Sequence, residues 1–405
     1  MPLQVLEHIF HQQLSLFLTS NDLLSPFQSG FRPGHSTVTA LLKVTDDIRW
    51  AMDHKSLTLL VLLDFSSAFN SVDFDILLGI LKSLNFSSST ISWFHSYLNG
   101  RSQQVRLDES SSDWCYLTAG VPQEGVRSPL LFSIFINSVT RVISSHFHLY
   151  ADDLQLYYHF RGKDAEAAAS AINSDLKLIG EWSRSFGLQI NPKKSQALVI
   201  GDRYMRNKLD LASLTPLWFN GVQIEYTNKA KNLGVIMDSK SWTAQVAEVS
   251  RKVHCTFHSL KCLQSFLPLK TKISLAQTLI QPIIDYADVC YLDVTEELLN
   301  KLERLQNICI RFIFNLKKYD HVSFGFRKVL KWLPIRLRKN TRILCLLFNI
   351  LLNPKTPYLR ERFSYSRPSD APCRSHLKNL LKSPPHSTDL LFHCSRCTVM
   401  ELTAT

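Results

Sequence analysis

Three carboxylates stand where this chain is expected to form buried β-structure. Asp152 and Asp153 occupy a predicted turn between two strand-like runs, and Asp64 ends a third apolar run, residues 57–63. A buried charge without a partner is costly, so carboxylates at such positions need a compensating group. Carboxylate oxygens are the ligands that Mg²⁺ prefers. The sequence therefore predicts a site for two Mg²⁺ ions, with Mn²⁺ as an alternative, at Asp64, Asp152 and Asp153, suited to phosphoryl transfer.

The composition favours a polyanionic partner. The 405 residues carry 46 Lys and Arg against 34 Asp and Glu, a net charge of +12, which suits nucleic acid or an anionic membrane surface. The most apolar run, residues 343–352, is interrupted by Asn349 and is far shorter than the ~20 residues of a membrane span. Residues 1–18 lack the basic start and cleavage site of a signal peptide. We therefore expect no membrane association and an intracellular location, nuclear or cytoplasmic.

The cysteines point to the same compartment. There are nine, without regular spacing, which is typical of reduced thiols. Cys373-x-x-His376 and Cys394-x-x-Cys397 have the spacing of zinc half-sites. The long gap between them and the absence of a supporting pattern favour an ordinary tail without zinc.

The periodicity of apolar residues predicts an α+β protein. β-like and helical segments alternate up to about residue 239, and the chain is almost wholly helical after residue 242. Asn220-Gly221, between two apolar runs, is the strongest short hairpin signal. We divide the chain into residues 1–50, 51–240, 241–362 and a loop-rich tail, 363–405.

Five short blocks follow one another around the three acids. One four-residue match arises by chance, whereas five ordered blocks over residues 28–235 are specific. The blocks are Gln28–Arg32 with Ser36-Thr37, Leu63–Phe69, Gly120–Gln123 with Pro129–Phe132 and Ile136-Asn137, Tyr150–Asp153, and Gly187-Leu188 with Asn191–Ser195 followed by Lys231–Val235. Together they resemble the reverse transcriptase of a non-LTR retrotransposon of the LINE-type, jockey-like kind. The likeness extends over roughly residues 3–365, because the helical region resembles this family's thumb.

The resemblance implies a right-hand polymerase fold. Residues 51–240 would form the palm, an antiparallel sheet packed on helices, with partial fingers before it and a helical thumb after it. The implied activity is that of an RNA-directed DNA polymerase, which extends a primer 3′-hydroxyl with dNTPs on an RNA template. Asp64 and Asp152 would bridge the two metal ions, and Asp153 would complete the cluster. The alternative for Asp152-Asp153 is a polar hairpin turn, where Asp is common.

The resemblance also assigns roles near the nucleotide. Phe69 would crowd a ribose 2′-hydroxyl and so favour deoxynucleotides, although a core Phe at a helix start is an alternative. Gln123 would back the template strand or the incoming base, unless it is an ordinary surface amide. Lys194 would neutralise or protonate the departing pyrophosphate, unless it is simply solvated.

Further residues are candidates for binding the nucleic acid. Arg32 would contact a phosphate, or else hold its own Gly/Pro-rich turn. Leu233 and Gly234 would form the primer grip. A basic stripe with interleaved aromatic residues would bind the phosphates of a template–primer duplex, unless it is only a solvated basic face. Its cations are Lys317, Lys318, Arg327, Lys328, Lys331, Arg336, Arg338, Lys339 and Arg342.

Some positions depart from the family pattern. Asn70 replaces an expected acid, Ser138 stands where Asp is common, and Glu124 puts negative charge near the template strand. Because the sequence starts within the fingers, we expect a truncated copy with weak activity at best. Two alternatives to an active polymerase therefore stay open: a decayed copy that only binds nucleic acid, and an interaction protein that reuses the palm as a scaffold.

Overall fold

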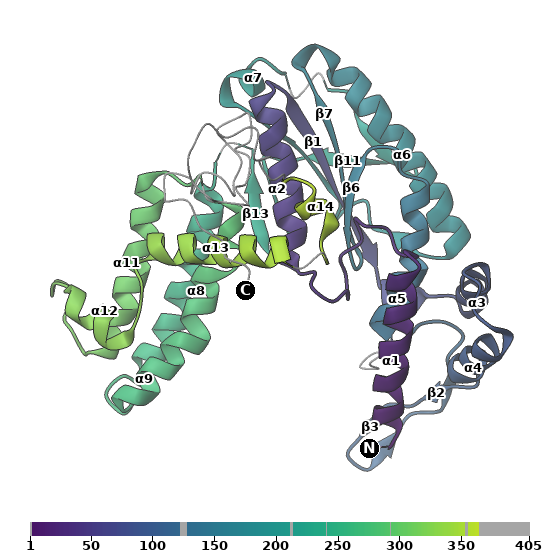
Figure 1. The fold of residues 1–405 in the computed structure, drawn as a ribbon, viewed down its shortest axis with the longest axis horizontal. Coiled ribbons are helices and arrows are strands. Elements are labelled where there is room, and N and C mark those ends of the chain that lie inside the picture. The colour runs from purple at the N-terminus through teal and green to yellow at the C-terminus, as the bar shows by residue number, and fades with distance from the viewer. Residues whose placement is uncertain are drawn as a thin grey trace, which may run out of the picture. The chain divides into compact units, whose positions relative to one another are not determined.

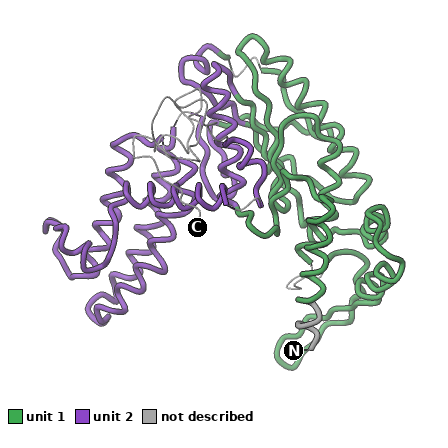
Figure 2. The backbone as a smooth tube through the Cα atoms, viewed as in Figure 1, with its two compact units in different colours: residues 1–36, 58–197, 209–227 green, residues 37–57, 198–208, 228–405 purple. Residues whose placement is uncertain are grey.

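The chain divides into two compact units that interleave along the sequence (Figure 2). The computed structural model describes residues 2–121, 128–210, 214–239, 241–291, 293–352 and 355–363. Unit 1 consists of residues 1–36, 58–197 and 209–227, and unit 2 of residues 37–57, 198–208 and the chain from 228 onward. The four predicted domains are contiguous stretches instead, and their boundaries remain predictions. Nowhere in the described ranges is there a helix with the length and apolarity that crossing a membrane requires.

A mixed seven-stranded sheet has most of its residues in unit 1 (Figure 1). The strand order is β10-β11-β9-β1-β7-β6, with β8 beside β1. The strands are β1 (Leu57–Ser66), β6 (His146–Tyr150), β7 (Asp153–Phe160), β8 (Gln189–Ile190), β9 (Gln196–Ile200), β10 (Leu217–Phe219) and β11 (Val222–Tyr226). The hairpins β6–β7 and β10–β11 are antiparallel, and the latter turns at the predicted Asn220-Gly221. The α+β class is confirmed, but β9 and β11 pair in parallel, so the sheet is not wholly antiparallel as expected.

The burial pattern of β1 explains where its acid lies. Residues 57–61 are all buried, as expected for a central strand covered on both faces. From Leu62 onward the burial alternates, so that Leu63 and Phe65 are buried while Asp64 and Ser66 are only half-buried. Successive side chains of a strand point to opposite faces. The alternation therefore directs the Asp64 carboxylate to the more accessible face at the end of the strand.

Helix α6 (Ala165–Phe186) covers part of this sheet, since it contacts β7 and β10. It buries a stripe that includes Ile172, Leu176 and Ile179, and it ends at Gly187, whose φ of 70° suits a residue without a side chain. The other helices of unit 1 are α1 (Pro2–Ser20), α3 (Phe74–Ser83), α4 (Ser88–Leu98) and α5 (Ser128–Ile136), with short 3₁₀ turns η1 (Ala68–Ser71), η2 (Asn137–Arg141) and η3 (Gly162–Asp164). Two small hairpins are formed by β2 (Ser102–Gln103) with β5 (Cys115–Tyr116) and by β3 (Arg106–Leu107) with β4 (Ser110–Ser111).

Unit 2 is largely helical, as the sequence predicts. Its core is built from the buried faces of α8 and α11, including Val246, Val253, Leu302 and Ile310. A π-helical turn, η5, interrupts the helix expected over residues 270–286. The helices are α2 (Thr37–Asp53), α7 (Arg203–Asn207), α8 (Thr243–Lys261), α9 (Leu269–Leu275), η5 (Ala276–Ile280), α10 (Gln281–Asp285), η6 (Asp288–Cys290), α11 (Glu296–Ile313), α12 (Phe324–Leu330), α13 (Ile335–Leu352) and α14 (Pro357–Arg360). The hairpin of β12 (Lys229–Asn232) and β13 (Val235–Asp238) completes the unit.

A segment far from β6 in sequence lies along that strand. The N–H of Ser29 donates to the carbonyl oxygen of Leu149 at 2.8 Å, and the N–H of Leu149 donates to that of Phe27 at 2.9 Å. This pairing brings Gly30 against the bend that follows β6. A Cβ atom at Gly30 would lie 2.3 Å from the backbone nitrogen of Ala151. Only glycine fits there, which gives a physical reason for the Gly30 of the first sequence block.

Replacing Gly30 by Ala should therefore destabilise unit 1. We expect Gly30→Ala to lower the free energy of unfolding by about 1–3 kcal/mol, because the Ala151 backbone must move to admit the methyl group. The matched control is Gly79→Ala in α3, where an added Cβ meets nothing within 4 Å. The control should stabilise the chain by about 0.5–1 kcal/mol. Chemical denaturation of both variants measures the difference, and equal effects would contradict the close approach.

Candidate active site

Two hydrogen bonds hold the backbone of Asp64 at the end of β1. Its N–H donates to Ser195 Oγ at 3.3 Å, and its carbonyl oxygen accepts from the N–H of Asn191 at 2.8 Å. Ser195 is buried, and its hydroxyl donates to the carbonyl oxygen of Asn191 at 2.9 Å. The loop 191–195 thus fixes the acid, while its carboxylate, 42% exposed, stays accessible to solvent.

Asp152 and Asp153 lie at the bend of the β6–β7 hairpin. Tyr150 pairs with Asp153, so that Ala151 and Asp152 form the bend between them. Ala151 has a φ of 53°, in the left-handed region that L-residues rarely adopt. Strained backbone persists where surrounding contacts determine it, and such contacts come from Gly30. The acidic pair is therefore held on a rigid bend and not on a loose loop.

The structure brings Asp64 into electrostatic reach of this pair. β1 and β7 are neighbours in the sheet, and Asp153 is the first residue of β7. Desolvation raises the pKa of Asp152, and the charge of Asp64 adds to that rise. The pKa of Asp153 is raised to about 6 by desolvation, then by the charges of Asp152 and Asp64. Asp153 is exposed to solvent, although nearby protein atoms crowd its carboxylate and reduce its hydration.

The three carboxylates have the donor chemistry of a magnesium site. Mg²⁺ binds oxygen ligands, and mutual repulsion among the acids is the kind that a divalent cation relieves. As the side chains lie, however, no three His, Cys, Asp or Glu among the described residues form a group that could hold a metal ion. The carboxylates would therefore have to move closer together before they could share a cation.

Lys194 lies beside the first acid. Its Nζ is 3.8 Å from Asp64 Oδ2, and the Lys194 side chain is 68% exposed. An exposed pair at this distance contributes little to stability, about 0–1 kcal/mol. The contact does place a mobile cation next to the acidic cluster, as its predicted role with pyrophosphate would require, and that role remains a prediction.

Phe69 is part of an aromatic cluster. Its ring stacks on Phe132 of α5 with centroids 4.2 Å apart, and it meets Phe31 edge-on at 5.9 Å. The N–H of Val121 donates to the carbonyl oxygen of Phe69 at 2.9 Å. The ring is therefore half-buried and fixed by packing, which both the predicted gate and the alternative core role would require.

Arg32 holds its own turn. Its Nη1 donates to the carbonyl oxygens of Ser25 at 2.8 Å and Gln28 at 3.0 Å. These contacts correspond to the structural alternative, and its contact with phosphate stays a prediction. Gln123 lies outside the described residues, as do Cys373, His376, Cys394 and Cys397.

Leu233 and Gly234 form the two-residue turn of the β12–β13 hairpin, between the paired residues Asn232 and Val235. Both have positive φ, 43° for Leu233 and 85° for Gly234. Such turns match the twist of the flanking strands but strongly favour Gly, Asn or Asp. The turn belongs to unit 2, whereas the acids belong to unit 1.

Fewer cations of the basic stripe are available for nucleic acid than the sequence predicts. Five of its nine cations are engaged inside unit 2: Arg327 with Glu303, Arg336 with Glu296, Arg338 with Asp285, Arg342 with Asp285 and Asp288, and Lys339 with the carbonyl oxygen of Tyr291. Lys339 is buried, and desolvation lowers its pKa to about 8. The prediction that all nine cations form one phosphate-binding surface is wrong for the buried Lys339, and the four arginines are paired with acids. Lys317, Lys318, Lys328 and Lys331 are the exposed cations that remain.

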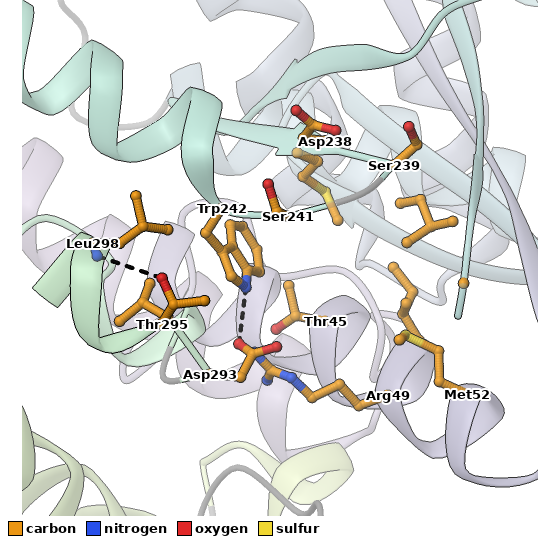
Figure 3. A pocket seen from close by; sticks show the side chains of 15 residues that line it. Thr45, Arg49, Met52, Asp238, Ser239, Ser241, Trp242, Asp293, Thr295 and Leu298 are labelled. Atoms are coloured by element: carbon orange, nitrogen blue, oxygen red, sulfur yellow. Dashed lines mark hydrogen bonds and ion pairs between the residues drawn. The ribbon is translucent and has the colours of Figure 1, made fainter. Parts of the chain in front are cut away.

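A cavity of about 240 Å³ lies within unit 2 (Figure 3). Trp242 Nε1 donates to Asp293 Oδ1 at 2.8 Å, and Arg49 Nη2 donates to the same oxygen at 2.6 Å. Thr295 Oγ1 accepts from the N–H of Leu298 and so begins α11. The hydrogen bonds of these polar side chains go to other residues of the protein, which gives the side chains a structural role. The three acids do not line it.

Sequence reasoning missed the residues that hold the acids. The sequence placed Ser195 in a block but gave it no role of its own. The available signal is its position: it is a small polar residue shortly after β8, the strand that pairs with the end of β1. The buried pair of Ser29 Oγ and His148 Nε2, 2.8 Å apart, fastens residues 27–30 to β6. No local pattern could reveal that pair, because 119 positions separate the two residues.

Comparison with known proteins identifies relatives. The family model described as reverse transcriptase (RNA-dependent DNA polymerase) matches residues 1–237. The chain is 27% identical over 325 residues to a probable RNA-directed DNA polymerase from transposon BS of Drosophila melanogaster, covering 77% of this chain and 35% of that protein. It is 26% identical over 315 residues to the RNA-directed DNA polymerase from mobile element jockey of the same species, covering 74% and 33%. The chain thus spans about a third of the length of these curated relatives.

Among solved structures, telomerase from Candida albicans in complex with a telomeric RNA fragment is similar with a TM-score of 0.46 and 12% identity. The match covers 89% of this chain and 58% of that one. A score at this level carries no argument about fold or activity.

The family assignment rests on the sequence match and agrees with the motifs. The matched segment contains the three acids, the loop 191–195 and the Leu233-Gly234 turn. Its relatives come from mobile elements, so the resemblance to the jockey-like kind is confirmed. The α+β sheet with its helices is the palm that this resemblance implies. The chain belongs to the reverse transcriptase (RNA-dependent DNA polymerase) family.

Proposed function

We propose that this chain carries an RNA-directed DNA polymerase site that extends a DNA primer with dNTPs on an RNA template. The observation that carries the proposal is the position of Asp64 on β1, beside the strand β7 that begins at Asp153, where its charge raises the pKa of Asp152 and Asp153. Family membership supports the reaction type, and the names of the transposon relatives support the RNA template. The net charge of +12 supports a nucleic-acid partner.

The proposed ligands of two Mg²⁺ ions, or Mn²⁺, are Asp64, Asp152 and Asp153. Bound metal supplies charge neutralisation at the attacking and leaving oxygens of the phosphoryl transfer. The protein supplies position: the loop 191–195 fixes the Asp64 backbone, and the rigid bend fixes the other two acids. Ionised carboxylates are required, so the raised pKa of Asp153 makes the site sensitive to pH near 6.

Other predicted residues take supporting roles in this proposal. Lys194, beside Asp64, would neutralise the departing pyrophosphate, and Phe69 would limit the space at the ribose 2′ position. The proposed contacts of Gln123 with the template strand or base, and of Arg32 with phosphate, rest on the family resemblance alone. The Leu233-Gly234 turn would hold the primer strand. The exposed cations of residues 317–331 would bind duplex phosphates, since counterion release favours such contacts.

Removing one proposed ligand should abolish extension. Asp152→Asn keeps the shape of the side chain but removes its charge, and a loss of several kcal/mol of transition-state stabilisation corresponds to a drop of at least about 100-fold in rate. The matched control is Asp113→Asn, an exposed acid between β4 and β5. The assay is Mg²⁺-dependent extension of a DNA primer on an RNA template.

Extension that persists in Asp152→Asn contradicts the assignment of the site. If the wild type does not extend the primer, its binding of a hybrid decides between the two alternatives. Salt-sensitive binding of an RNA–DNA hybrid without extension indicates a decayed copy that only binds nucleic acid. Absence of hybrid binding at low salt leaves the scaffold alternative.

The raised pKa of Asp153 predicts how its neutral variant changes stability with pH. Because its pKa is about 6 in the folded chain and about 4 when unfolded, the ionised form penalises folding above pH 6, and the penalty fades as pH falls from 6 to 4. Asp153→Asn should therefore raise the melting temperature relative to wild type at pH 7.5 in chelator, with a smaller gain at pH 5. A gain that is equal at both values would contradict the charge repulsion.

The exposed lysines of α12 and its C-terminal end should contribute to hybrid binding. Lys328→Glu with Lys331→Glu reverses two exposed charges, so the affinity for an RNA–DNA hybrid should fall and its dependence on salt should weaken. The control reverses Lys163 and Lys177, two lysines of unit 1 at η3 and α6. Equal losses for both pairs would show a general charge effect and not a specific surface. Binding is measured by fluorescence anisotropy over a salt series.

A further inference from the structure

The turn of the β12–β13 hairpin needs outside support. Leu233 adopts a φ of 43°, which is unfavourable for a residue with a side chain, and Gly234 follows at 85°. A two-residue turn with positive φ at both positions is stable with Asn-Gly, but here the first residue is Leu. Contacts from elsewhere in unit 2 must therefore select this conformation.

Tyr286 supplies such contacts. Its hydroxyl donates to the carbonyl oxygen of Leu233 at 2.7 Å. Its ring also lies close to the next residue, because a Cβ atom at Gly234 would be 3.1 Å from Tyr286 Cε1. One side chain thus binds the carbonyl of the strained residue and packs against its glycine neighbour.

Tyr286 is itself fixed at a chain reversal. Its N–H donates to the carbonyl oxygen of Pro282 at 3.0 Å, at the end of α10, and the following residue, Ala287, turns the chain with a φ of 52°. The Tyr286 hydroxyl also lies 3.1 Å from Thr37 Oγ1, in the first turn of α2. The hydroxyl therefore joins three segments of unit 2 that are distant in sequence: the start of α2, the hairpin turn and the end of α10.

We propose that the Tyr286 hydroxyl is a positioning group that holds the Leu233-Gly234 turn in the conformation that binds the primer strand. The inference rests on the proposed function, which gives this turn its primer. Tyr286 acts through the turn: its hydroxyl orients the Leu233 carbonyl, and its ring packs against Gly234. Thr37 Oγ1 orients the hydroxyl in turn, so the start of α2 contributes to the same arrangement.

The direct test removes only the hydroxyl. We expect Tyr286→Phe to raise the KM for the primer–template about 3- to 10-fold with little change in kcat, because one hydrogen bond that orients the turn is lost. Hydrogen exchange should become faster in a peptide covering residues 229–238. The matched control is Tyr358→Phe, which removes a buried hydroxyl 3.3 Å from Thr39 Oγ1 in the same unit and should leave both quantities unchanged.

A double-variant cycle tests the link to α2. Thr37→Val and Tyr286→Phe each remove one partner of the same contact. The double variant should therefore bind primer–template about as weakly as whichever single variant binds it less tightly. Thr37→Ser keeps the hydroxyl and should restore binding. Additive losses would overturn the role of Thr37 in this arrangement.

Two results would overturn the inference itself: unchanged exchange of residues 229–238 in Tyr286→Phe, or faster exchange with an unchanged KM. The exchange comparison does not depend on the proposed function, which is judged separately by the dependence of wild-type extension on Asp152. Should the wild type not extend primers, the affinity of a hybrid replaces the KM and the exchange comparison is unaffected.

Discussion

The crowding of like charges at the junction of β1 and β7 is the constraint on which the rest of unit 1 depends. Desolvation raises the pKa of Asp152 and Asp153, and the negative charge of Asp64 adds to the rise at both acids. A fold that served stability alone would not collect acids in this way. The sheet nevertheless holds them there through backbone contacts.

Those backbone contacts come from segments outside the two strands. The loop 191–195 binds both the N–H and the carbonyl oxygen of Asp64, and residues 27–30 pair with β6 and press on the bend at Ala151. Each support depends on a small residue in a crowded position. Ser195 is buried beside Asp64, and Gly30 lies so close to Ala151 that a Cβ atom would clash. Strain at the bend and repulsion among the acids are thus both offset by packing and hydrogen bonds that lie outside the acidic cluster.

The sequence predicted the local parts of this arrangement better than the distant ones. The strand β1 that carries Asp64, the Asn220-Gly221 hairpin and the helices after residue 242 follow from periodicity and turn chemistry, which act over a few residues. The parallel pairing of β9 with β11 could not be read from the chain, since no local pattern specifies which strands become neighbours in a sheet. The same holds for Arg338 and Arg342: their charge is evident, but only the fold reveals that Asp285 and Asp288 lie opposite them. Ser195 and Tyr286 acquire their roles through contacts that no short motif encodes.

The central claim is that Asp64 and Asp152 share one cation site. The most direct measurement is the Mn²⁺ affinity, followed by electron paramagnetic resonance, of wild type, Asp64→Asn, Asp152→Asn and the double variant in the presence of a hybrid. If the acids bind common ions, each single variant loses most of the affinity and the double variant loses little more, with a coupling well above about 0.5 kcal/mol. Additive losses, or single variants that retain the affinity of the wild type, would contradict a shared site.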